Sequence, residues 1–434
     1  MTVRGHFLGL IALSLIGIAL PAHAQTSLVN TTTLSGATGF SDAKINNQGQ
    51  VIYTAAFGTQ GNVYTNQSGA NTFVVKESDA SPIAGATYSA IDSLDYNLDD
   101  SGRITFRSTL TPTASGPSIF RKDSTTTSVV VQKSVTTVSP GTTMNTLGNY
   151  DANNSGYTVW SGRQNTATNT AGNWGIWSRT IAGVGTQLVA QNDVAPGLSS
   201  SARFNTFAFP SVDNSGNVSF FATVTNDLNA GNGVFTRVAN GTVSKIAAGG
   251  DTAAGVTNGF FSFFSRVTRN DNNTTAFFGG ATVGATELRG IWTGSSSLSL
   301  VAINGQTVTT ALGTATFGNT YNLGNLNASG TGVFRAASMT GAFTQAVFSF
   351  TGANLTPLFA QGDSLFGSTI TTLGVPSIND AGTIVFNYTL ANGVAGVYSS
   401  AAPAVVPESG TVSLFGIGIS ALGLVIRRKR SVGK

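Results

Sequence analysis

The chain has 434 residues, of which only 9% are charged against a typical share of about 25%, and its formal net charge is +4. It is 41% hydrophobic, and aromatic and β-branched residues recur along it, which excludes a disordered protein and suits a polar, β-rich extracellular one. Cysteine is absent, and the two histidines, His6 and His23, lie near the N-terminus. The rest of the chain therefore excludes disulfides, zinc or copper sites of the usual kind, and Ser-His or Cys-His nucleophile pairs.

The first 24 residues have the parts of a secretory signal peptide. Arg4 gives the positive start, and an apolar run extends over residues 7–20. Ala22 and Ala24 are small residues at the positions that signal peptidase requires, which makes Gln25 the expected mature N-terminus. An uncleaved membrane anchor is the alternative, but the apolar run is short for one.

A short pattern occurs seven times: Asn or Asp, two residues, Gly, three residues and an aromatic residue. Its first copy runs from Asn46 through Gly49 to Tyr53, and its fifth copy has Asn273 in the glycine position. Asn or Asp can close a turn with its side chain, Gly adopts positive φ without steric cost, and Asn tolerates the same region. We therefore predict structural turns, rather than functional sites, at Gly49, Gly102, Gly156, Gly216, Asn273, Gly330 and Gly382.

Strand patterns surround each turn. Successive copies are 52 to 60 residues apart, which is too long for one coil of a solenoid and close to the roughly 40–50 residues of a propeller blade. After the glycine, apolar residues alternate, as in residues 218–224, and predict a strand with one buried face. A second strand reads Gly-apolar-aromatic (233–235), a third is short and apolar (245–247), and a fourth (204–209) leads into the next turn. Four short antiparallel strands in each unit predict a β-propeller blade.

The two ends of the repeat region predict a closed ring. Residues 27–29 and 39–41 resemble third and fourth strands, whereas residues 383–390 and 397–398 resemble first and second strands. Two strands from each end would complete one composite blade and remove the exposed sheet edges. We therefore predict an all-β propeller of seven four-stranded blades over residues 25–402, closed by pairing of N- and C-terminal strands. The alternative is a row of small β-sandwiches, but units of this length would be thin for separate cores.

Residues 403–434 form a separate tail. Its Val406-Pro407-Glu408 stretch is followed by apolar residues 412–426, a predicted short membrane helix with fewer residues than the about 20 that comfortably span a bilayer. A basic cluster comes next, and by the positive-inside rule it stays in the cytoplasm while the body is held outside: Arg427, Arg428, Lys429 and Arg430. A plain C-terminal anchor is the alternative reading of this segment.

The basic character of the chain belongs to its two ends. Six of the 22 basic residues and one of the 18 acidic residues lie in the predicted signal peptide and tail, so the body has 16 basic and 17 acidic residues. This near-neutral body argues against nucleic acid as a partner.

The tail resembles the PEP-CTERM sorting signal of Gram-negative bacteria that make exopolysaccharide, with Ser409 in place of the last proline of the motif. This resemblance implies that an exosortase, a membrane transpeptidase-like protease, processes the tail after a membrane anchoring that is at least transient. Residues 27–400 resemble the family named for its NxxGxxxF motif, which is found on extracellular bacterial proteins with interchangeable C-terminal anchors. This second resemblance supplies no known chemistry.

The body has no constellation that points to a catalytic residue, a metal ligand or a cofactor. Equivalent carboxylates in turns could line one rim of a propeller, but turn chemistry explains them as well: Asp193, Asp251 and Asp363. The densest acidic stretch has one residue in a repeat turn and lacks the alternating acids of a calcium loop: Asp92, Asp95, Asp99 and Asp100. Three tryptophans fall in strand positions that predict packing, Trp160, Trp177 and Trp292, whereas Trp174 is the candidate for surface contact.

The leading hypothesis is a non-catalytic, exported propeller that works at the cell surface or in the extracellular matrix of a biofilm. Its expected partners are the exosortase-like processing enzyme, and exopolysaccharide or surface proteins. The alternative is a carboxylate-dependent extracellular glycosidase or polysaccharide lyase with its site at a propeller mouth. A third reading is a purely structural coat component.

Overall fold

The computed structural model describes residues 25–58, 60–66, 70–91, 96–112, 116–138, 142–165, 171–180, 183 and 185–400. Every regular element in these ranges is a β-strand, so the prediction of an all-β fold is confirmed. Residues 26–400 form one compact unit. The predicted signal peptide, with Ala22 and Ala24, and the predicted tail from residue 403 lie outside the described residues. Among the described residues there is no helix with the length and apolar character needed to cross a membrane.

Most strands belong to antiparallel sheets in which neighbours along the chain are hydrogen-bonded neighbours in space. The first strands are β2 (Gly39–Ile45), β6 (Thr87–Ile91) with β7 (Asn97–Leu98), β12 (Thr142–Ala152), β16 (Arg203–Val212), β20 (Phe260–Arg269), β26 (Tyr321–Leu326), and β32 (Ser368–Leu373) with β33 (Ser377–Ile378). The second strands are β3 (Val51–Phe57), β8 (Ile104–Thr111), β13 (Thr158–Asn165), β17 (Val218–Thr225), β21 (Thr275–Val283), β27 (Thr331–Ala336) and β34 (Ile384–Leu390).

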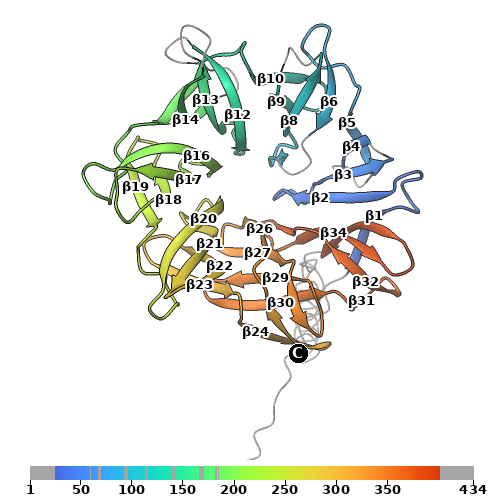
Figure 1. The fold of residues 1–434 in the computed structure, drawn as a ribbon. Helices are drawn as coiled ribbons and strands as arrows, with labels where there is room; N and C mark the ends of the chain where they lie inside the picture. Colours follow the sequence, from blue (N-terminus) through green and yellow to red (C-terminus); the bar gives the residue numbers. More distant parts are fainter. Residues whose placement is uncertain are drawn as a thin grey trace, which may run out of the picture. The chain divides into compact units, whose positions relative to one another are not determined.

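The outer strands complete these sheets. The third strands are β4 (Gln60–Thr65), β9 (Ser118–Lys122), β14 (Ala171–Arg179), β18 (Asn232–Arg237), β22 (Thr286–Gly294), β29 (Ala346–Thr351) and β35 (Ala395–Ser400). The fourth strands are β5 (Thr72–Lys76), β10 (Thr127–Gln132), β15 (Thr186–Ala190), β19 (Val243–Ala248), β23 (Leu298–Ile303), β30 (Asn354–Ala360) and β1 (Gln25–Asn30). Figure 1 shows these sheets one after another, in chain order, around a common centre.

Five short strands lie outside this scheme. β11 (Thr137–Val138) pairs with β12, and β31 (Ser364–Leu365) pairs with β32. The other three form a small separate sheet: β24 (Thr307–Thr310), β25 (Gly313–Phe317) and β28 (Met339–Gly341). The sheets therefore carry four regular strands with local additions, rather than four strands alone as the sequence predicts.

The repeat turn has a different place in the sheet from the one that the sequence suggested. In the structure it is the hairpin between the first and second strands, as between β16 and β17, which pair from Arg203–Thr225 to Val212–Val218. The strand taken as the fourth of one unit, residues 204–209, is thus the first strand of the next sheet. The alternating pattern identified the strands of the regular sheets but not their partners, because periodicity is the same on both sides of a turn.

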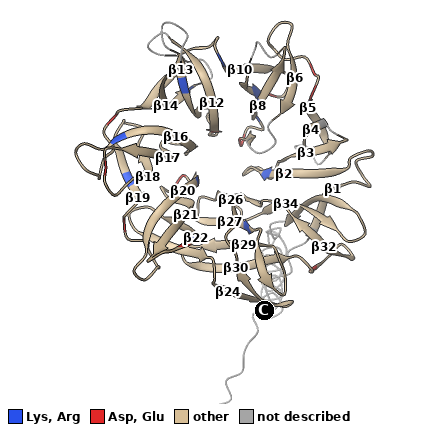
Figure 2. Cartoon of the chain, in the orientation of Figure 1, with Lys and Arg blue, Asp and Glu red and all other residues tan. Residues whose placement is uncertain are grey.

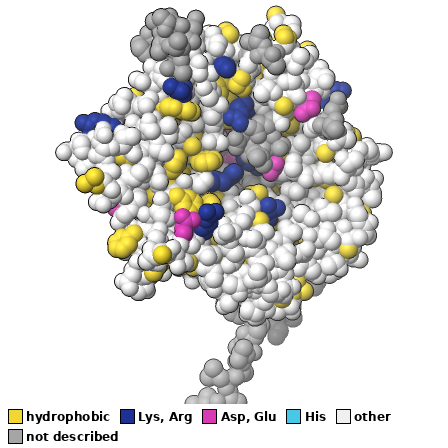
Figure 3. All heavy atoms as spheres, in the orientation of Figure 1, with side chains coloured by type: hydrophobic (Ala, Val, Ile, Leu, Met, Phe, Trp, Pro, Cys, Tyr) yellow, Lys and Arg dark blue, Asp and Glu magenta, His cyan; other side chains and the backbone are white. Residues whose placement is uncertain are grey.

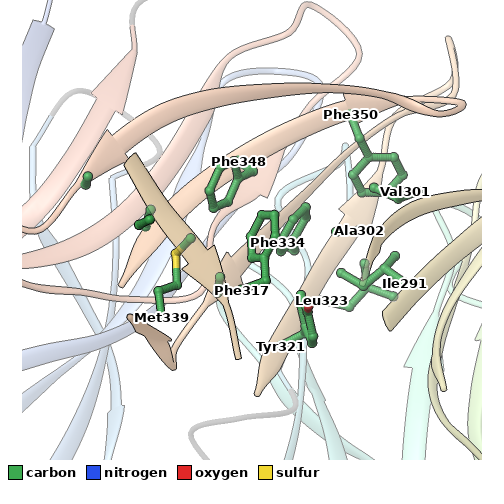
Figure 4. Close-up of a cluster of buried hydrophobic side chains, with 14 of the residues drawn as sticks. Ile291, Val301, Ala302, Phe317, Tyr321, Leu323, Phe334, Met339, Phe348 and Phe350 are labelled. Carbon is green, nitrogen blue, oxygen red and sulfur yellow. The ribbon is translucent and has the colours of Figure 1, made fainter. Parts of the chain in front are cut away.

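The aromatic residue of the repeat packs between neighbouring sheets. It pairs across the sheet with an aromatic residue of the third strand in every copy, as Phe334 pairs with Phe348, and these two rings stack with centroids 5.2 Å apart. Figure 4 shows this pair in a cluster that also includes Ile291 and Val301 from the preceding sheet. Trp160, Trp177 and Trp292 are fully buried, so their predicted packing role is confirmed. All seven repeat aromatics are fully buried: Tyr53, Phe106, Trp160, Phe220, Phe277, Phe334 and Phe386.

The two ends of the described unit meet in one sheet. β1 is hydrogen-bonded to β35, so the last sheet has its fourth strand from the N-terminal end. Val29 of β1 is buried in a cluster with Val385 and Val397 of this sheet and with residues of β2 and β3. The predicted exchange of two strands from each end is wrong in one detail, because β2 pairs with β3 and begins the first sheet instead of joining the last one. Within the described N-terminal residues, β1 alone crosses to the C-terminal sheet.

Candidate functional site

The first strands surround a cavity of about 370 Å³. The residues that line it belong to β2, β7, β12, β16, β20, β26 and β33 or come just before these strands. In most copies, the last lining residue is the one immediately before the first repeat residue. Figure 3 shows Lys and Arg side chains gathered around the centre of one face, and Figure 2 shows a basic residue on β2 close to that centre. The cavity is therefore the place where every copy of the repeat contributes different side chains to one space.

A strained, charged residue lies in this lining. Asp42 has φ of 49° and sits at an irregularity in the β2–β3 pairing between Ser41 and Lys44. Phe209 is a second lining residue of this kind, with φ of 48°. Asp42 and Phe209 each lie four residues before the first residue of a repeat copy. Such bulges turn a side chain out of the regular strand pattern, and strained residues of this kind collect at functional sites. Both residues contribute to the cavity lining, and Phe209 also packs against a hydrophobic cluster with Phe261 and Phe264.

Three cations influence the carboxylate of Asp42. Burial raises its pKa, and the positive charges of Lys44, Arg266 and Arg335 oppose that rise. Lys44 also lies over the Tyr96 ring, with Nζ 5.8 Å from the ring centroid. Arg266 is half-buried in the cavity lining and makes no hydrogen bond or ion pair with another described residue. This side of the cavity combines one carboxylate with an excess of basic side chains.

The second carboxylate of the lining, Asp151, accepts hydrogen bonds from neighbouring strands. Asp151 accepts hydrogen bonds from the backbone N–H of Val212 at 2.9 Å and of Ala152 at 2.9 Å. It also accepts from the Ser211 hydroxyl at 3.2 Å and from the Asn97 amide. Apart from Ala152 of β12 itself, these donors come from β7 and β16 on either side of β12, and burial raises the pKa of Asp151. The side chain thus caps the free edge of neighbouring first strands.

The repeat turns are linked to one another beside the cavity. The first repeat residue accepts bonds within its own turn, as Asn46 does from the N–H of Gln48 and Gln50. Where this residue is Asn, its amide also donates to the backbone carbonyl of the same residue in the next copy, with N···O distances of 2.7 to 3.3 Å. The donors are Asn46, Asn153, Asn270, Asn327 and Asn379, the last of which donates to Asn46.

The second repeat residue makes a parallel set of links that the sequence interpretation missed. Its side-chain oxygen accepts from the backbone N–H of the equivalent residue in the preceding copy at 2.6 to 2.9 Å. The acceptors are Asn47, Asp100, Asn154, Asn214, Asp271 and Asp380. Six of the seven copies have Asn or Asp here, and Ala328 is the exception, so the signal was visible in the sequence. The acidic stretch at residues 92–100 thus supplies Asp99 and Asp100 to turns.

Where the first repeat residue is Asp, an arginine contacts its carboxylate and links it to other groups. Asp213 is paired with Arg269 at 2.8 Å, with both side chains almost fully buried at 0% and 2% exposure. Arg269 also donates to Asn273 at 2.7 Å, which accounts for the Asn in the fifth glycine position, where φ is 64°. Asp99 is paired with Arg103 at 2.6 Å, and Arg103 donates onward to the carbonyl of Asn154. The seven glycine-position residues all have φ between 64° and 83°.

The remaining predicted residues do not join the cavity. Asp193, Asp251 and Asp363 each accept a hydrogen bond from the backbone N–H three residues earlier, at 2.7 to 2.8 Å, and none lines the cavity. Turn chemistry is therefore the confirmed role of these carboxylates. Trp174 is half-buried, with the Arg163 guanidinium 5.7 Å from its ring centroid. Asp92 and Asp95 lie outside the described residues, and the described residues contain no group of three or more His, Asp or Glu side chains placed to hold a metal ion.

Antiparallel sheets placed around a cavity that is lined by their first strands define a β-propeller. The sequence profile of a family of unknown function, DUF7453, matches residues 17–337 and again residues 153–416. Because these matches cover more than half of the chain, the protein belongs to that family.

Several solved structures resemble the chain at low sequence identity. A prolyl endopeptidase is 10% identical with a TM-score of 0.48, and the alignment covers 84% of this chain and 50% of the endopeptidase, so the chain spans about half its length. The β-propeller domain of the trilobed protease from Pyrococcus furiosus is 8% identical with a TM-score of 0.49, over 84% of this chain and 93% of that domain. An acylaminoacyl peptidase from Pyrococcus horikoshii is 9% identical with a TM-score of 0.44, over 82% and 50%. None of the curated proteins matches the chain in sequence.

Proposed function

We propose that the protein is an exported, non-catalytic binding propeller of seven blades, closed by the pairing of β1 with β35, whose central cavity holds its ligand. The observation that carries this proposal is the cavity itself, because all first strands converge on it and it contains side chains with no role in the turns. At about 370 Å³ it lies within the range of roughly 300–1,000 Å³ for small-molecule sites. A small molecule or one end of a chain fits this volume better than a protein segment.

The hydrogen bonds from the last repeat copy to the first support the closed ring. Asn379 donates to the carbonyl of Asn46 at 3.1 Å, and Asn47 accepts from the N–H of Asp380 at 2.9 Å. These two contacts have the same form as the contacts between copies that follow one another in the chain. A ring of this kind has fixed walls, which favours binding through a preformed site.

Binding is favoured over catalysis by the carboxylates of the cavity. Glycoside hydrolysis by the common route needs two carboxyl groups, one on each side of the scissile bond. Of the two in the described lining, Asp151 is committed to four hydrogen-bond donors and only Asp42 is available. Asp42, with its raised pKa, remains the residue on which the alternative proposal of a glycosidase or lyase would depend.

Ligand binding is tested by filling the cavity. Val375 is a half-buried lining residue, and Val375→Trp places a large side chain in the space without altering a charge. We expect the purified protein to bind a component of the extracellular matrix of its own cells, and the Trp variant to lose at least about 10-fold in affinity, measured by isothermal titration calorimetry. Equal affinity in both proteins would contradict the cavity as the site. Release of reducing ends that is abolished by Asp42→Asn would instead favour the enzyme.

Export and sorting follow from the two ends of the sequence and belong to the same proposal. Arg4 with the apolar run supports export, and the Pro407-Glu408 stretch with the basic cluster supports processing by an exosortase-like enzyme. We expect protein recovered from the culture medium or cell surface to begin at Gln25 and to lack the segment after residue 408, as mass spectrometry of its terminal peptides will show. Intact Arg427–Arg430 on the extracellular protein would contradict cleavage, and retention in the cytoplasm would contradict export.

A further inference from the structure

The basic side chains in and near the cavity differ in how many hydrogen bonds they donate to other protein groups. Arg269 donates to four side chains, including Asp213, and is fully used in holding the turns. Arg335 donates to the carbonyl of Leu373 at 2.5 Å and to Asn322 at 2.9 Å. Arg266, by contrast, has no hydrogen-bond or ion-pair partner among the described residues, although Val267 and Thr268, which follow it in β20, are buried. Five N–H donors of one guanidinium are thus left for water or a ligand.

The charges around Arg266 leave a positive excess. Asp42 lies within electrostatic reach of Arg266, Lys44 and Arg335, so one negative charge faces three positive ones. Arg269 is paired with Asp213, and Asp151 adds a second negative charge that also lies within reach of Lys44, so three positive charges face two negative ones. In a partly enclosed space of low effective dielectric, this excess attracts an anion more strongly than it would in water.

The shape and chemistry of the donor favour a carboxylate. A guanidinium presents its donors in a planar fork that matches the two oxygens of a carboxylate, which a single ammonium group cannot do. The lining also contains polar amides, such as Asn149 and Asn322, and apolar residues, such as Phe209 and Pro376. Sugar rings present hydroxyls on their edges and C–H groups on their faces, so this mixture suits a sugar that carries an acid group.

We propose that the central cavity binds a carboxylate-bearing sugar, a uronic acid, with Arg266 as the ligand of its carboxylate and Asp42 as a nearby negative charge that weakens the attraction. This inference rests on the proposed binding function and adds the class of ligand. It predicts that substitutions of Arg266 and of Asp42 change the affinity for the ligand in opposite directions. Removing Arg266 weakens binding, whereas neutralising Asp42 strengthens it, and a merely structural role for both residues would weaken binding in both variants.

The test uses isothermal titration calorimetry on the purified protein with D-galacturonate and, as its neutral counterpart, D-galactose. We expect binding of the acid alone, a loss of about 10- to 100-fold in Arg266→Gln, partial recovery in Arg266→Lys, and a gain of about 2- to 10-fold in Asp42→Asn. Arg289→Gln is the matched control, because Arg289 is exposed, pairs with Glu287 and does not line the cavity. Its affinity should equal that of the unmodified protein. Thermal midpoints within a few degrees of the parent exclude unfolding of each variant.

The remaining outcomes separate the inference from the proposed function. If galactose binds as well as galacturonate and Val375→Trp abolishes both, the cavity is a binding site and the acid preference is wrong. If Asp42→Asn weakens and Arg266→Gln strengthens binding, the ligand is a cation. Loss of all cavity binding overturns both proposals. Oligogalacturonates distinguish the two sources of the acid, since stronger binding of the trimer than of the monomer indicates the end of a polysaccharide rather than a free sugar acid.

Discussion

Replacing Arg269 with leucine is expected to lower the free energy of unfolding by about 3–5 kcal/mol, because it leaves the carboxylate of Asp213 buried without a counter-charge. Asp213 is fully buried, and water cannot take the place of the guanidinium without opening the joint between two sheets. The same substitution also removes the donors that reach Ser219, Thr236 and Asn273. Urea denaturation followed by tryptophan fluorescence measures the loss.

The matched control changes both partners to the residues found at other joints. Asp213→Asn supplies the amide that the other copies use, and Arg269→Leu gives the residue found at the equivalent Leu326. The double variant should recover most of the lost stability and fall within about 1 kcal/mol of the parent, since replacing a whole buried ion pair is often neutral or favourable. If the double variant is as unstable as Arg269→Leu alone, the Asn and Leu found in other copies cannot replace this ion pair.

Removing β1 is expected to destabilise the entire unit rather than one sheet. β1 covers the edge of β35, and the loss of Val29 alone takes a fully buried side chain from a shared core, a change of about 1.5–3 kcal/mol before the lost strand hydrogen bonds are counted. The freed edge of β35 would then be open to pairing with other molecules. A chain that begins at Gly39 should therefore aggregate or elute as an oligomer in size-exclusion chromatography.

A synthetic peptide supplies the control for this truncation. Residues 25–36 added in trans should restore the monomer and raise the thermal midpoint, whereas the same peptide with Val29→Asp should not, because a charge cannot enter the cluster with Val385 and Val397. A truncated chain that stays monomeric with an unchanged midpoint would show that β1 is dispensable for closure.

The architecture could be predicted from the repeat because its turns and its buried aromatics follow simple rules. The spacing of Asn46, Gly49 and Tyr53 recurs with the same hydrogen bonds and the same burial in the structure. The sequence did not show as directly which strands share a sheet. A hairpin within one sheet and a connection between two sheets both appear in the sequence as a turn between two apolar stretches. The short turn between Val212 and Val218 was the available clue, because only a hairpin connects two paired strands over so few residues.

The cavity could not be predicted, because its chemistry depends on positions that differ between copies. Asp42, Asn149, Phe209 and Arg266 all stand four residues before a repeat Asn or Asp, yet they share no chemical type. Their convergence is a property of how the sheets are arranged around the cavity and not of any one unit. Arg266 stands close to Arg269 and Asp271 in the sequence, and nothing in this stretch separates the residue that faces the cavity from the two that serve the turns until the other copies are placed around it.

The links between turns also bear on how such a chain can lengthen or shorten during evolution. Most joints use a side chain of one copy and the backbone of the next, and backbone groups are the same in every copy. A duplicated or deleted unit therefore meets a compatible neighbour. The Asp213–Arg269 joint is different, since it requires a particular side chain on each side. A unit inserted between these two copies would separate the acid from its base, so this buried ion pair limits how freely the order of the units can be exchanged.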